Sequence, residues 1–399
     1  MTLDPTDLIS EDIVAGLLAD LVRIPSINPA FRIEGDPPDH FGEQAKAAFV
    51  ARWLAAAGIA VTMQEVLPGR PNVVARVPGR PGGLRLLLEC HLDTVQVTGM
   101  EAPFTPRLEN GRLYGRGAVD DGGCIAAMML ALRALAARPA ACEVVLLAAI
   151  DEEYRYRGVS AYLAAGHHAD GGIAGEPTGL RIVSACKGCV RWRVELQGRA
   201  AHSSEPWRGA DAIAAASVLL THLSATLAPR LAARVHPLVG CPTLLCSMIE
   251  GGQGPNTVAA RCLLTFDRRT LPGETSLSAW EEARAAIACC VLPDGVTALV
   301  HPPFIDSAAM ASADARHPLL SAARAACRDA GVQDTPLGVA FGSDAAHMAA
   351  HGIPSIVFGP GDIAQAHAID EFVSLGEVAR AARMIEQIAR HFCADNQGG

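Results

Sequence analysis

The sequence predicts an α/β fold: a mostly parallel sheet with flanking helices, interrupted by an inserted α+β domain with an antiparallel sheet. Two short apolar runs, Leu84–Glu89 and Val144–Ile150, have the length and composition of strands buried on both faces, as in parallel sheets. Val190–Leu196 instead alternates polar and apolar residues, as a strand with one solvent-facing side does. From about Pro302 the pattern of strands buried on both faces returns, so the segment between the two parts with this pattern is predicted to be an inserted domain.

Length and composition set the number of domains and exclude some classes of function. A chain of 399 residues is too long for one core, and we predict a first domain from residues 1–185 and 302–399 and an inserted domain from residues 186–301. The net charge of −9, without a basic cluster, argues against binding to nucleic acid or to a membrane. The acidic N-terminus lacks the layout of a signal peptide, and the best apolar runs are interrupted by Arg133 or His222, so no membrane span is expected.

The 12 cysteines are scattered through apolar segments. That distribution favours buried thiols in a reducing cytoplasm over a disulfide framework. Cys186 and Cys189 form a CxxC pair, but no second pair stands at the spacing of a zinc ribbon, so a structural role is favoured for them.

Periodicity and helix-stop residues place the remaining elements. Pro25, Gly58 and Pro139 each end a predicted helix. Helices are expected at about Glu11–Arg23, Glu43–Ala57, Cys124–Arg138, Val159–Ala165, Asp211–Leu227, Ser278–Val291, Leu319–Ala330 and Leu375–Phe392. Further strands are expected at Val73–Val77, Gly172–Ala174, Thr243–Ile249, Thr257–Arg269, Thr297–His301 and Ser355–Gly359.

Three carboxylates, Asp151, Glu152 and Glu153, follow directly after Val144–Ile150. Adjacent charges at the end of a buried strand lose hydration and repel one another. A solvated loop would relieve that repulsion. A bound cation would also relieve it, as would a proton held by one of the carboxylates. The residues at the ends of the other predicted strands favour these last two explanations.

His91 follows the first buried run, and Asp93 stands two residues further on, where it can hold one ring nitrogen as metal-bound imidazoles require. A satisfied core histidine is the alternative interpretation. Asp120 and Asp121 stand in a glycine-rich segment just before the helix Cys124–Arg138. Capping also explains acids there, because the helix dipole favours negative charge, and we assign Asp121 to that role.

The predicted parallel strands end at His91, at Glu152 and Glu153, and at Glu176, and His367 follows the strand Ser355–Gly359 in the same way. Ligand sites of open parallel sheets lie at the carboxyl ends of the strands, so these side chains are expected to meet, together with Asp120. Imidazole with several carboxylates suits zinc, manganese or cobalt. Because the carboxylates are too many for one tetrahedral ion with an open position, two divalent ions bridged by one carboxylate are expected.

Short motifs stand in order along nearly the whole chain: HLDTV from His91, GRGAVDD from Gly115, DEE from Asp151, GEPTG from Gly175, KG from Lys187, AHSSEPWRGADAI from Ala201 and QAHAIDEF from Gln365. Together they resemble the dinuclear zinc family of aminoacylases, exopeptidases and deacylases. Within that family, FGPGDIAQAHAIDEFV, the HSSEP loop and HPPF at His301 are most similar to the acetylornithine deacetylases, with succinyl-diaminopimelate desuccinylases as more distant relatives.

The resemblance implies a zinc-exopeptidase-like catalytic domain, an inserted lid and dimerisation domain, and a role for each matched residue. Asp120 would bridge two ions, one held by His91 and Glu176 and the other by Glu153 and His367. Glu152 would be the general base, and Asp93 would orient His91. His202 would approach the site of the other subunit of a homodimer and stabilise the oxyanion. Asn256, Arg269, Gly342 and Ser343 would contact the substrate, Arg269 through two bonds to a carboxylate.

Residue chemistry supports the roles of the two glutamates independently. One of the pair can coordinate an ion while its neighbour, Glu152, stays free to take a proton from a bridging water. The predicted reaction is hydrolysis of the amide bond of an N-acyl-L-amino acid through a metal-bridging hydroxide, which releases a carboxylate and a free amino acid. Dipeptidase, carboxypeptidase or desuccinylase activity on the same scaffold is the alternative. A non-catalytic relative is disfavoured because every ligand position is filled.

The expected cofactors are two divalent ions, zinc first, with cobalt or manganese as alternatives. Departures from the family pattern stand at Gln96, Gly122, Tyr154–Arg157 and Arg268–Arg269. They leave the proposed ligands in place and bear on which acyl group or side chain is accepted. The apolar helix Asp211–Leu227 and the proposed role of His202 both favour a homodimer.

Overall fold

The computed structural model describes residues 8–311, 314 and 316–394 and divides the chain into two compact units. The first contains the described residues of Met1–Ser184, Ser312–Leu337 and Ser343–Gly399, and the second contains Ala185–Ala311 and Gly338–Gly342. The second unit therefore continues past residue 301, where we expected the inserted domain to end. Residues 1–7, on which part of the signal-peptide prediction rests, lie outside the described residues.

The first unit is built around an eight-stranded sheet with the order β1-β2-β6-β3-β7-β15-β8-β14. Its strands are β1 (Ala60–Leu67), β2 (Arg70–Val77), β3 (Arg85–His91), β6 (Glu143–Ala149), β7 (Gly171–Ala174), β8 (Val183–Cys186), β14 (Leu337–Val339) and β15 (Ser355–Val357). The central strands β6, β3, β7 and β15 run parallel to one another, whereas β1, β2 and β8 run antiparallel to the strands beside them. The predicted α/β fold class is confirmed.

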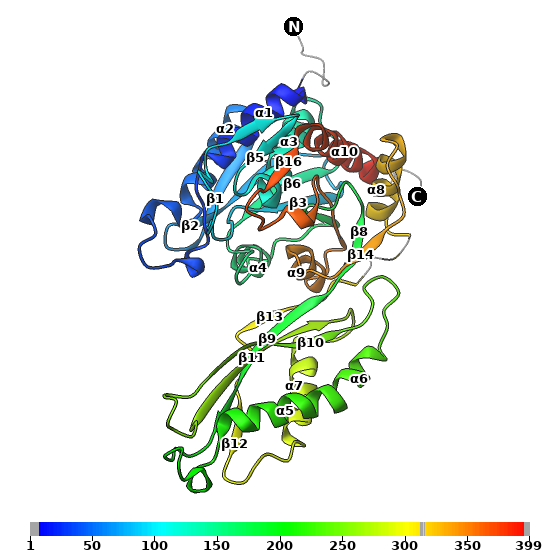
Figure 1. The fold of residues 1–399 in the computed structure, drawn as a ribbon. Coiled ribbons are helices and arrows are strands. Elements are labelled where there is room, and N and C mark those ends of the chain that lie inside the picture. Colours follow the sequence, from blue (N-terminus) through cyan, green and yellow to red (C-terminus); the bar gives the residue numbers. More distant parts are fainter. Residues whose placement is uncertain (1–7, 312–313, 315, 395–399) are drawn as a thin grey trace. The chain divides into compact units, whose positions relative to one another are not determined.

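Helices cover both faces of this sheet (Figure 1). On one face α1 (Glu11–Val22), α3 (Gly123–Ala137), α8 (Pro318–Asp329) and α10 (Leu375–Ala394) pack together, and α2 (Gln44–Ala56) packs on β1 and β2. On the other face, α4 (Arg157–Ala164) packs against α9 (Asp344–Ala350). α3 is apolar on nearly every side and is buried along most of its length, as expected of a helix inside the core.

The carboxyl ends of the parallel strands lie at one edge of the sheet. β3 ends at His91, which is paired with Ala149 at the end of β6. β7 pairs with the other side of β3 and leads to Glu176, and β15 pairs with β7 and leads to the segment that contains His367. Because these strands all run in the same direction, the segments that follow them begin at the same edge.

A small three-stranded sheet, with the order β16-β5-β4, was not predicted. It consists of β4 (Arg107–Glu109), β5 (Arg112–Tyr114) and β16 (Phe372–Ser374). Strands this short do not show alternation, and the pairing of β16 with β5 joins distant parts of the chain. β1 was missed as well, because it is an edge strand with little regular burial. β8, β14 and α9 were also missed.

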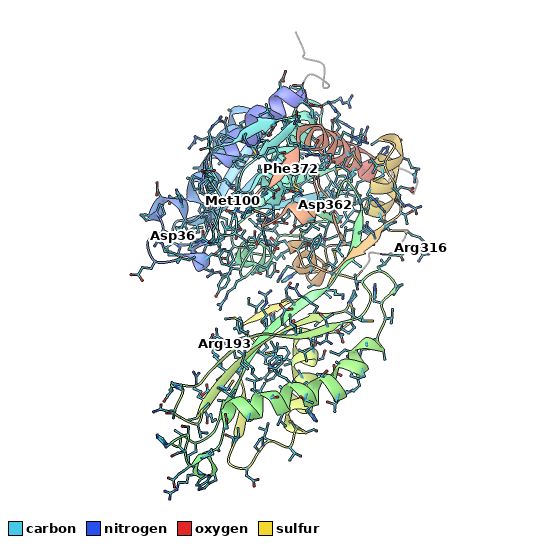
Figure 2. The ribbon with its side chains drawn as sticks, in the orientation of Figure 1. Asp36, Met100, Arg193, Arg316, Asp362 and Phe372 are labelled. Carbon is cyan, nitrogen blue, oxygen red and sulfur yellow. A yellow bond between two sulfur atoms is a disulfide. The ribbon has the colours of Figure 1, made fainter. Side chains whose placement is uncertain are left out.

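The second unit is an antiparallel sheet with helices on one face. Its strand order is β10-β11-β9-β12, with β13 also paired to β9. The elements are β9 (Gly188–Gln197), β10 (Thr243–Gly251), β11 (Arg261–Thr270), β12 (Thr297–Val300), β13 (Ile305–Ser307), α5 (Ala212–Thr226), α6 (Ala228–Ala232) and α7 (Ser276–Ala288). Trp192, Val194 and Leu196 of β9 are buried with α5 and α7, whereas Arg193 between them is exposed (Figure 2). This is the α+β arrangement that the alternation predicted.

Two observations bear on the expectations drawn from composition. Cys142 and Cys393 form a disulfide, with Cα atoms 5.4 Å apart and a sequence separation of 251. No local motif indicates a pair so far apart, and this disulfide was not predicted. The other ten cysteines are free, and six of them are buried, as expected. The described residues also contain one helical stretch, Ala212–Ala232, that is long and apolar enough to cross a membrane despite His222, although core helices of soluble proteins pass the same test.

Gly158 allows α4 to approach the end of β6 closely, and this contact gives a test of the packing next to the site. A Cβ added to Gly158 would lie 2.4 Å from the backbone nitrogen of Ile150, whereas a Cβ added to Gly16 in α1 would meet no atom within 4 Å. We predict that Gly158→Ala lowers the free energy of unfolding by about 1–3 kcal/mol, because the main chain must move. Gly16→Ala should raise it by about 0.5–1 kcal/mol. Urea unfolding measures both, and a Gly158→Ala variant as stable as the unaltered protein would contradict the prediction.

Candidate metal centre

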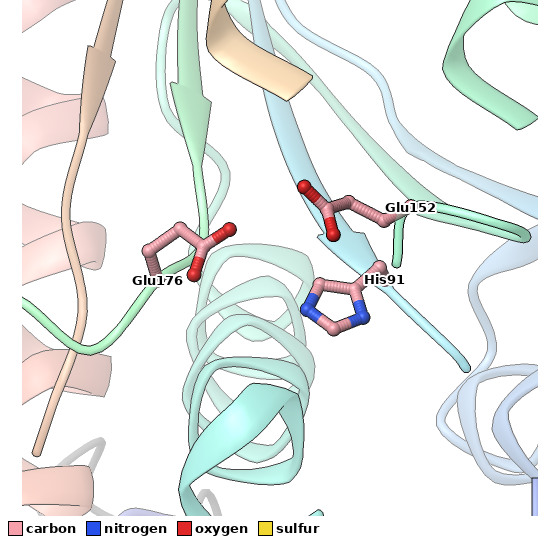
Figure 3. Close-up of side chains that lie close together, drawn as sticks. All are labelled: His91, Glu152 and Glu176. Carbon is pink, nitrogen blue, oxygen red and sulfur yellow. The ribbon is translucent and has the colours of Figure 1, made fainter. Parts of the chain in front are cut away.

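Two groups of possible metal ligands meet at the carboxyl edge of the parallel strands. His91, Glu152 and Glu176 form one group, and Asp120, Glu153 and His367 form the other; in each group the ligand atoms lie within 4.8 Å of one another. In Figure 3 the side chains of the first group come from the ends of different strands and converge on a common space. The structure thus brings together the side chains that the sequence placed at this edge.

Asp120 connects the two groups through its two carboxylate oxygens. Oδ1 lies 2.9 Å from Nε2 of His91, and Oδ2 lies 3.2 Å from Nε2 of His367. Nε2 of His367 also lies 3.2 Å from Oε1 of Glu153. Two donors bound to the same tetrahedral zinc ion at normal bond lengths would stand about 3.3 Å apart. The spacing and the nitrogen and oxygen donors therefore fit two divalent ions that share Asp120.

An irregular turn, rather than a regular element, carries Asp120. The turn Ala118–Gly122 has non-helical backbone angles at Asp120 and Asp121, and α3 then begins without a side-chain cap. Our capping assignment for Asp121 is wrong, because its Oδ2 instead accepts the backbone N–H of His91 at 3.1 Å. The side chain of Asp121 thus holds the end of β3.

Asp93 supports the site through both its side chain and its main chain. Its carboxylate accepts the backbone N–H groups of Glu152 at 3.1 Å and of Glu153 at 3.2 Å. Nδ1 of His91 lies 3.0 Å from the carbonyl oxygen of Asp93 and 3.8 Å from its carboxylate. Just before the two glutamates, Asp151 has a left-handed φ of 69°, which turns the chain at the end of β6. One turn thus delivers Glu152 to the first group and Glu153 to the second.

The electrostatics of the site call for positive charge. Burial raises the pKa of Glu152 and of Glu176 well above the usual range, and burial together with the charge of Asp120 raises the pKa of Glu153 to about 7. Hydrogen bonds to Asp120 and Glu153 raise the pKa of His367 to about 10. The pKa values of the glutamates rise because these carboxylates lack a positive counter-charge. The pKa of His367 rises because its imidazole supplies that positive charge. A divalent cation would reverse these shifts by favouring ionised carboxylates and neutral imidazoles.

A buried polar network behind the site was not predicted from the sequence. Nδ2 of Asn28 donates to Asp93 at 2.7 Å and to Asp151 at 2.9 Å. Arg70 donates to Asp151 at 3.1 Å and forms two hydrogen bonds with the buried carboxylate of Glu43. Each of these residues is unremarkable in the sequence, because its partners lie far away along the chain.

Other buried acids close to the site were also missed. Burial and the nearby charge of Asp344 raise the pKa of Glu89 well above normal, and burial raises the pKa of Asp344 to about 7. Glu89 gave a usable signal, since it is the one acid near the end of an otherwise apolar run. Glu371 is fully buried beside Asp120, only four positions from His367 in the sequence, and had no role assigned.

The residues of the inserted domain that we predicted to contact the substrate, His202, Asn256 and Arg269, lie in the second unit. The carbonyl oxygen of Asn256 accepts the N–H of Ser203 at 2.9 Å, so the loops that carry His202 and Asn256 are adjacent. Nδ1 of His202 lies 2.7 Å from the hydroxyl of Ser204. Arg269 stands near the end of β11, and its Nε donates to Asp267 at 2.9 Å. The structure thus places His202 close to Asn256.

Gly342 and Ser343 stand where the chain passes from the second unit back to the first. The hydroxyl of Ser343 accepts the N–H of Ala345 at 3.3 Å and so caps α9. The capping explains why a serine stands at this position without reference to a substrate. The substrate contacts of both residues remain predictions.

Residues 87–391, which include all the proposed metal ligands, match the model of peptidase family M20/M25/M40. The chain belongs to this family. This chain is 30% identical over 394 residues to an acetylornithine deacetylase from Proteus mirabilis. The match covers 94% of this chain and 96% of the deacetylase. Membership confirms the predicted enzyme class: the protein is a metal-dependent amidohydrolase.

Solved structures of M20-family enzymes share the fold. A tripeptidase from Staphylococcus aureus has a TM-score of 0.77 at 19% identity and covers 97% of this chain and 99% of its own. A dinuclear metal-binding peptidase of the M20 family from Bacillus subtilis has a TM-score of 0.68 at 16% identity and covers 95% of this chain and 97% of its own. Both structural matches extend over the two units of this chain.

Proposed function

We propose that the protein hydrolyses the amide bond of N-acyl-L-amino acids and that N-acetylornithine is the first substrate to test. The arrangement of Glu152 and Glu153 carries the proposal. Glu153 stands in the group that contains Asp120, whereas the adjacent Glu152 lies beside the ligands of the other group, where a carboxylate that stays free of metal can act as a base. The deacetylase from Proteus mirabilis, similar over nearly the whole chain, supports the acyl amino acid as the substrate class.

Two divalent ions would occupy the site, zinc by preference, with cobalt or manganese as alternatives. His91 and Glu176 would hold one ion, Glu153 and His367 would hold the other, and Asp120 would bind both. When bound, the ions supply Lewis acidity, which polarises the amide carbonyl and makes a water molecule acidic enough to attack it.

Glu152 is the general base in this proposal. It would take the proton from the attacking water and return it to the nitrogen of the leaving amine, so that one carboxylate serves both halves of the reaction. Asp93 keeps Glu152 in place by accepting its backbone N–H, and it supports His91 through its carbonyl oxygen.

The substrate contacts belong to the same proposal. Arg269 would bind the α-carboxylate of the substrate through two parallel hydrogen bonds. His202 would donate to the oxyanion that forms on the attacked carbonyl, with Asn256 beside it. Gly342 and Ser343 would line the substrate site from the segment between β14 and α9.

Replacing the proposed base gives a direct test. We predict that Glu152→Gln lowers kcat about 10²–10⁴-fold, because the proton carrier is lost, while the protein still binds two equivalents of zinc. Glu153→Gln, one position along the chain, should instead weaken zinc binding. Steady-state kinetics and metal content after dialysis distinguish the two variants. A Glu152→Gln variant that keeps substantial activity, or that loses zinc as Glu153→Gln does, would refute the assignment.

A substrate panel tests the reaction itself. Chelated protein should be inactive and should regain hydrolysis of N-acetylornithine when zinc, cobalt or manganese is added, because the site supplies ligands but no other electrophile. N-acetyl derivatives of other amino acids, N-succinyl-diaminopimelate and dipeptides complete the panel. Faster cleavage of dipeptides than of any N-acyl amino acid would favour the peptidase alternative, and full activity after exhaustive chelation would end the proposal.

We also propose that the second unit forms a homodimer. β10 lies at the edge of its sheet with Leu245, Met248 and Ile249 exposed, and α5 leaves Ile213 and Val218 exposed as well. An exposed apolar edge strand readily pairs with another chain. The second copy would then offer its own His202 to the site.

Disruption of this surface tests the dimer. Ile249→Lys combined with Val218→Glu should convert the protein to a monomer, because charge at an apolar interface is costly, and light scattering would report the mass. Leu108→Glu, an equally exposed position in the first unit, is the control and should leave the mass unchanged. A wild-type protein that is monomeric at micromolar concentration would contradict the proposal.

A further inference from the structure

Glu371 holds the main chain that carries Asp120. Its Oε2 accepts the N–H of Gly117 at 3.0 Å, and its Oε1 accepts the N–H groups of Val119 at 2.9 Å and of Asp120 at 3.1 Å. Nη1 of Arg116 donates to Oε2 at 2.6 Å. Glu371 is only 1% exposed, so water does not compete for these hydrogen bonds.

The pairing of β16 with β5 brings Glu371 to this place. Phe372, labelled in Figure 2, is paired with Tyr114, so that Glu371 just before β16 meets Gly115 just after β5. The N–H of Gly115 donates to the carbonyl oxygen of Glu371 at 3.1 Å and extends the ladder. The rings of Phe372 and Tyr114 are 5.1 Å apart, and Arg112 lies over the ring of Phe372 at 4.5 Å. The short sheet therefore fixes the register of the two loops.

The loop that contains Glu371 also supplies His367. His367 adopts a left-handed φ of 62°, and its Nε2 reaches Oδ2 of Asp120 at 3.2 Å. Residues 367–371 thus contact Asp120 at two points, through its carboxylate and through its backbone N–H. A shift of this loop would move the proposed ligand His367 and, at the same time, Glu371, which supports the second ligand Asp120.

Besides the imidazoles of His91 and His367, Asp120 has carboxylates as neighbours, and these act against its position. Glu153 belongs to the same ligand group, and the charge of Asp120 also acts on Glu176. Carboxylates that face one another without water repel, and a free side chain would rotate away. The turn that carries Asp120 has no regular hydrogen-bonding pattern of its own at this residue, so the acceptors of Glu371 replace that pattern.

We propose that Glu371 is a positioning residue of the metal centre: it fixes the main chain of 117–120 so that Asp120 presents one oxygen to each ligand group. The proposal rests on the proposed metal sites, and it concerns the placement of a ligand and not the choice of substrate. Glu371 itself reaches the centre only through Asp120.

Glu371→Gln tests the proposal because it keeps the shape of the side chain and replaces one acceptor oxygen with a donor that faces other donors. In the full-length protein, stripped of metal and titrated with zinc against a chromophoric chelator, we expect the affinity for the weaker of the two ions to fall about 10–100-fold. At saturating zinc, kcat should fall more than KM changes. If no substrate in the panel is hydrolysed, the zinc titration still tests this proposal, because it measures metal affinity and needs no substrate.

Two further variants separate positioning from general stability. Glu386→Gln on α10 removes a carboxylate of 8% exposure that pairs with Arg390 at 2.6 Å, and it should leave the zinc affinity unchanged. Glu371→Asp keeps the charge next to Arg116 but is one methylene shorter, and it should fold normally with an intermediate zinc affinity. Wild-type affinity for both ions in a folded Glu371→Gln or Glu371→Asp variant would overturn the proposal. An equal loss of affinity in Glu386→Gln would overturn it too.

Discussion

Repulsion between buried carboxylates is the constraint on which the rest of the first unit depends. Asp120, Glu152, Glu153 and Glu176 come together at the edge of a sheet, where the imidazoles of His91 and His367 join them. Burial removes the water that would screen such charges, so the cluster is unfavourable unless cations occupy it. The fold must therefore hold the ligands in position against their own repulsion until the ions bind.

The supporting contacts act mainly on the main chain of the ligands. Asp93 accepts N–H groups from the turn that carries Glu152 and Glu153, and Glu371 accepts N–H groups from the turn that carries Asp120. A ligand side chain must stay free to bind an ion, so the backbone is the part of the residue that can be held without competing with the metal. Both supports are carboxylates, which accept several donors at once.

The two units contribute different things to the proposed reaction. The first unit contains all the proposed metal ligands and the proposed base, which explains why the centre can be described from that unit alone. The second unit contains the proposed substrate contacts His202, Asn256 and Arg269 and the exposed strand β10, which belongs to the proposed dimer surface. A fold shared with a tripeptidase at 19% identity leaves the choice of substrate to such side chains.

The sequence by itself determined the fold class and the set of side chains that meet at the site, since apolar runs that end in His91, Glu152 and Glu176 follow from the rule that parallel strands end at one edge. Only the tertiary structure decided what holds those side chains. Asn28 reaches Asp151 across 123 residues, and Glu371 reaches the N–H of Asp120 across 251. Such residues look ordinary in the sequence, because their hydrogen-bond partners lie far away along the chain. Their roles exist only after distant strands such as β5 and β16 have paired.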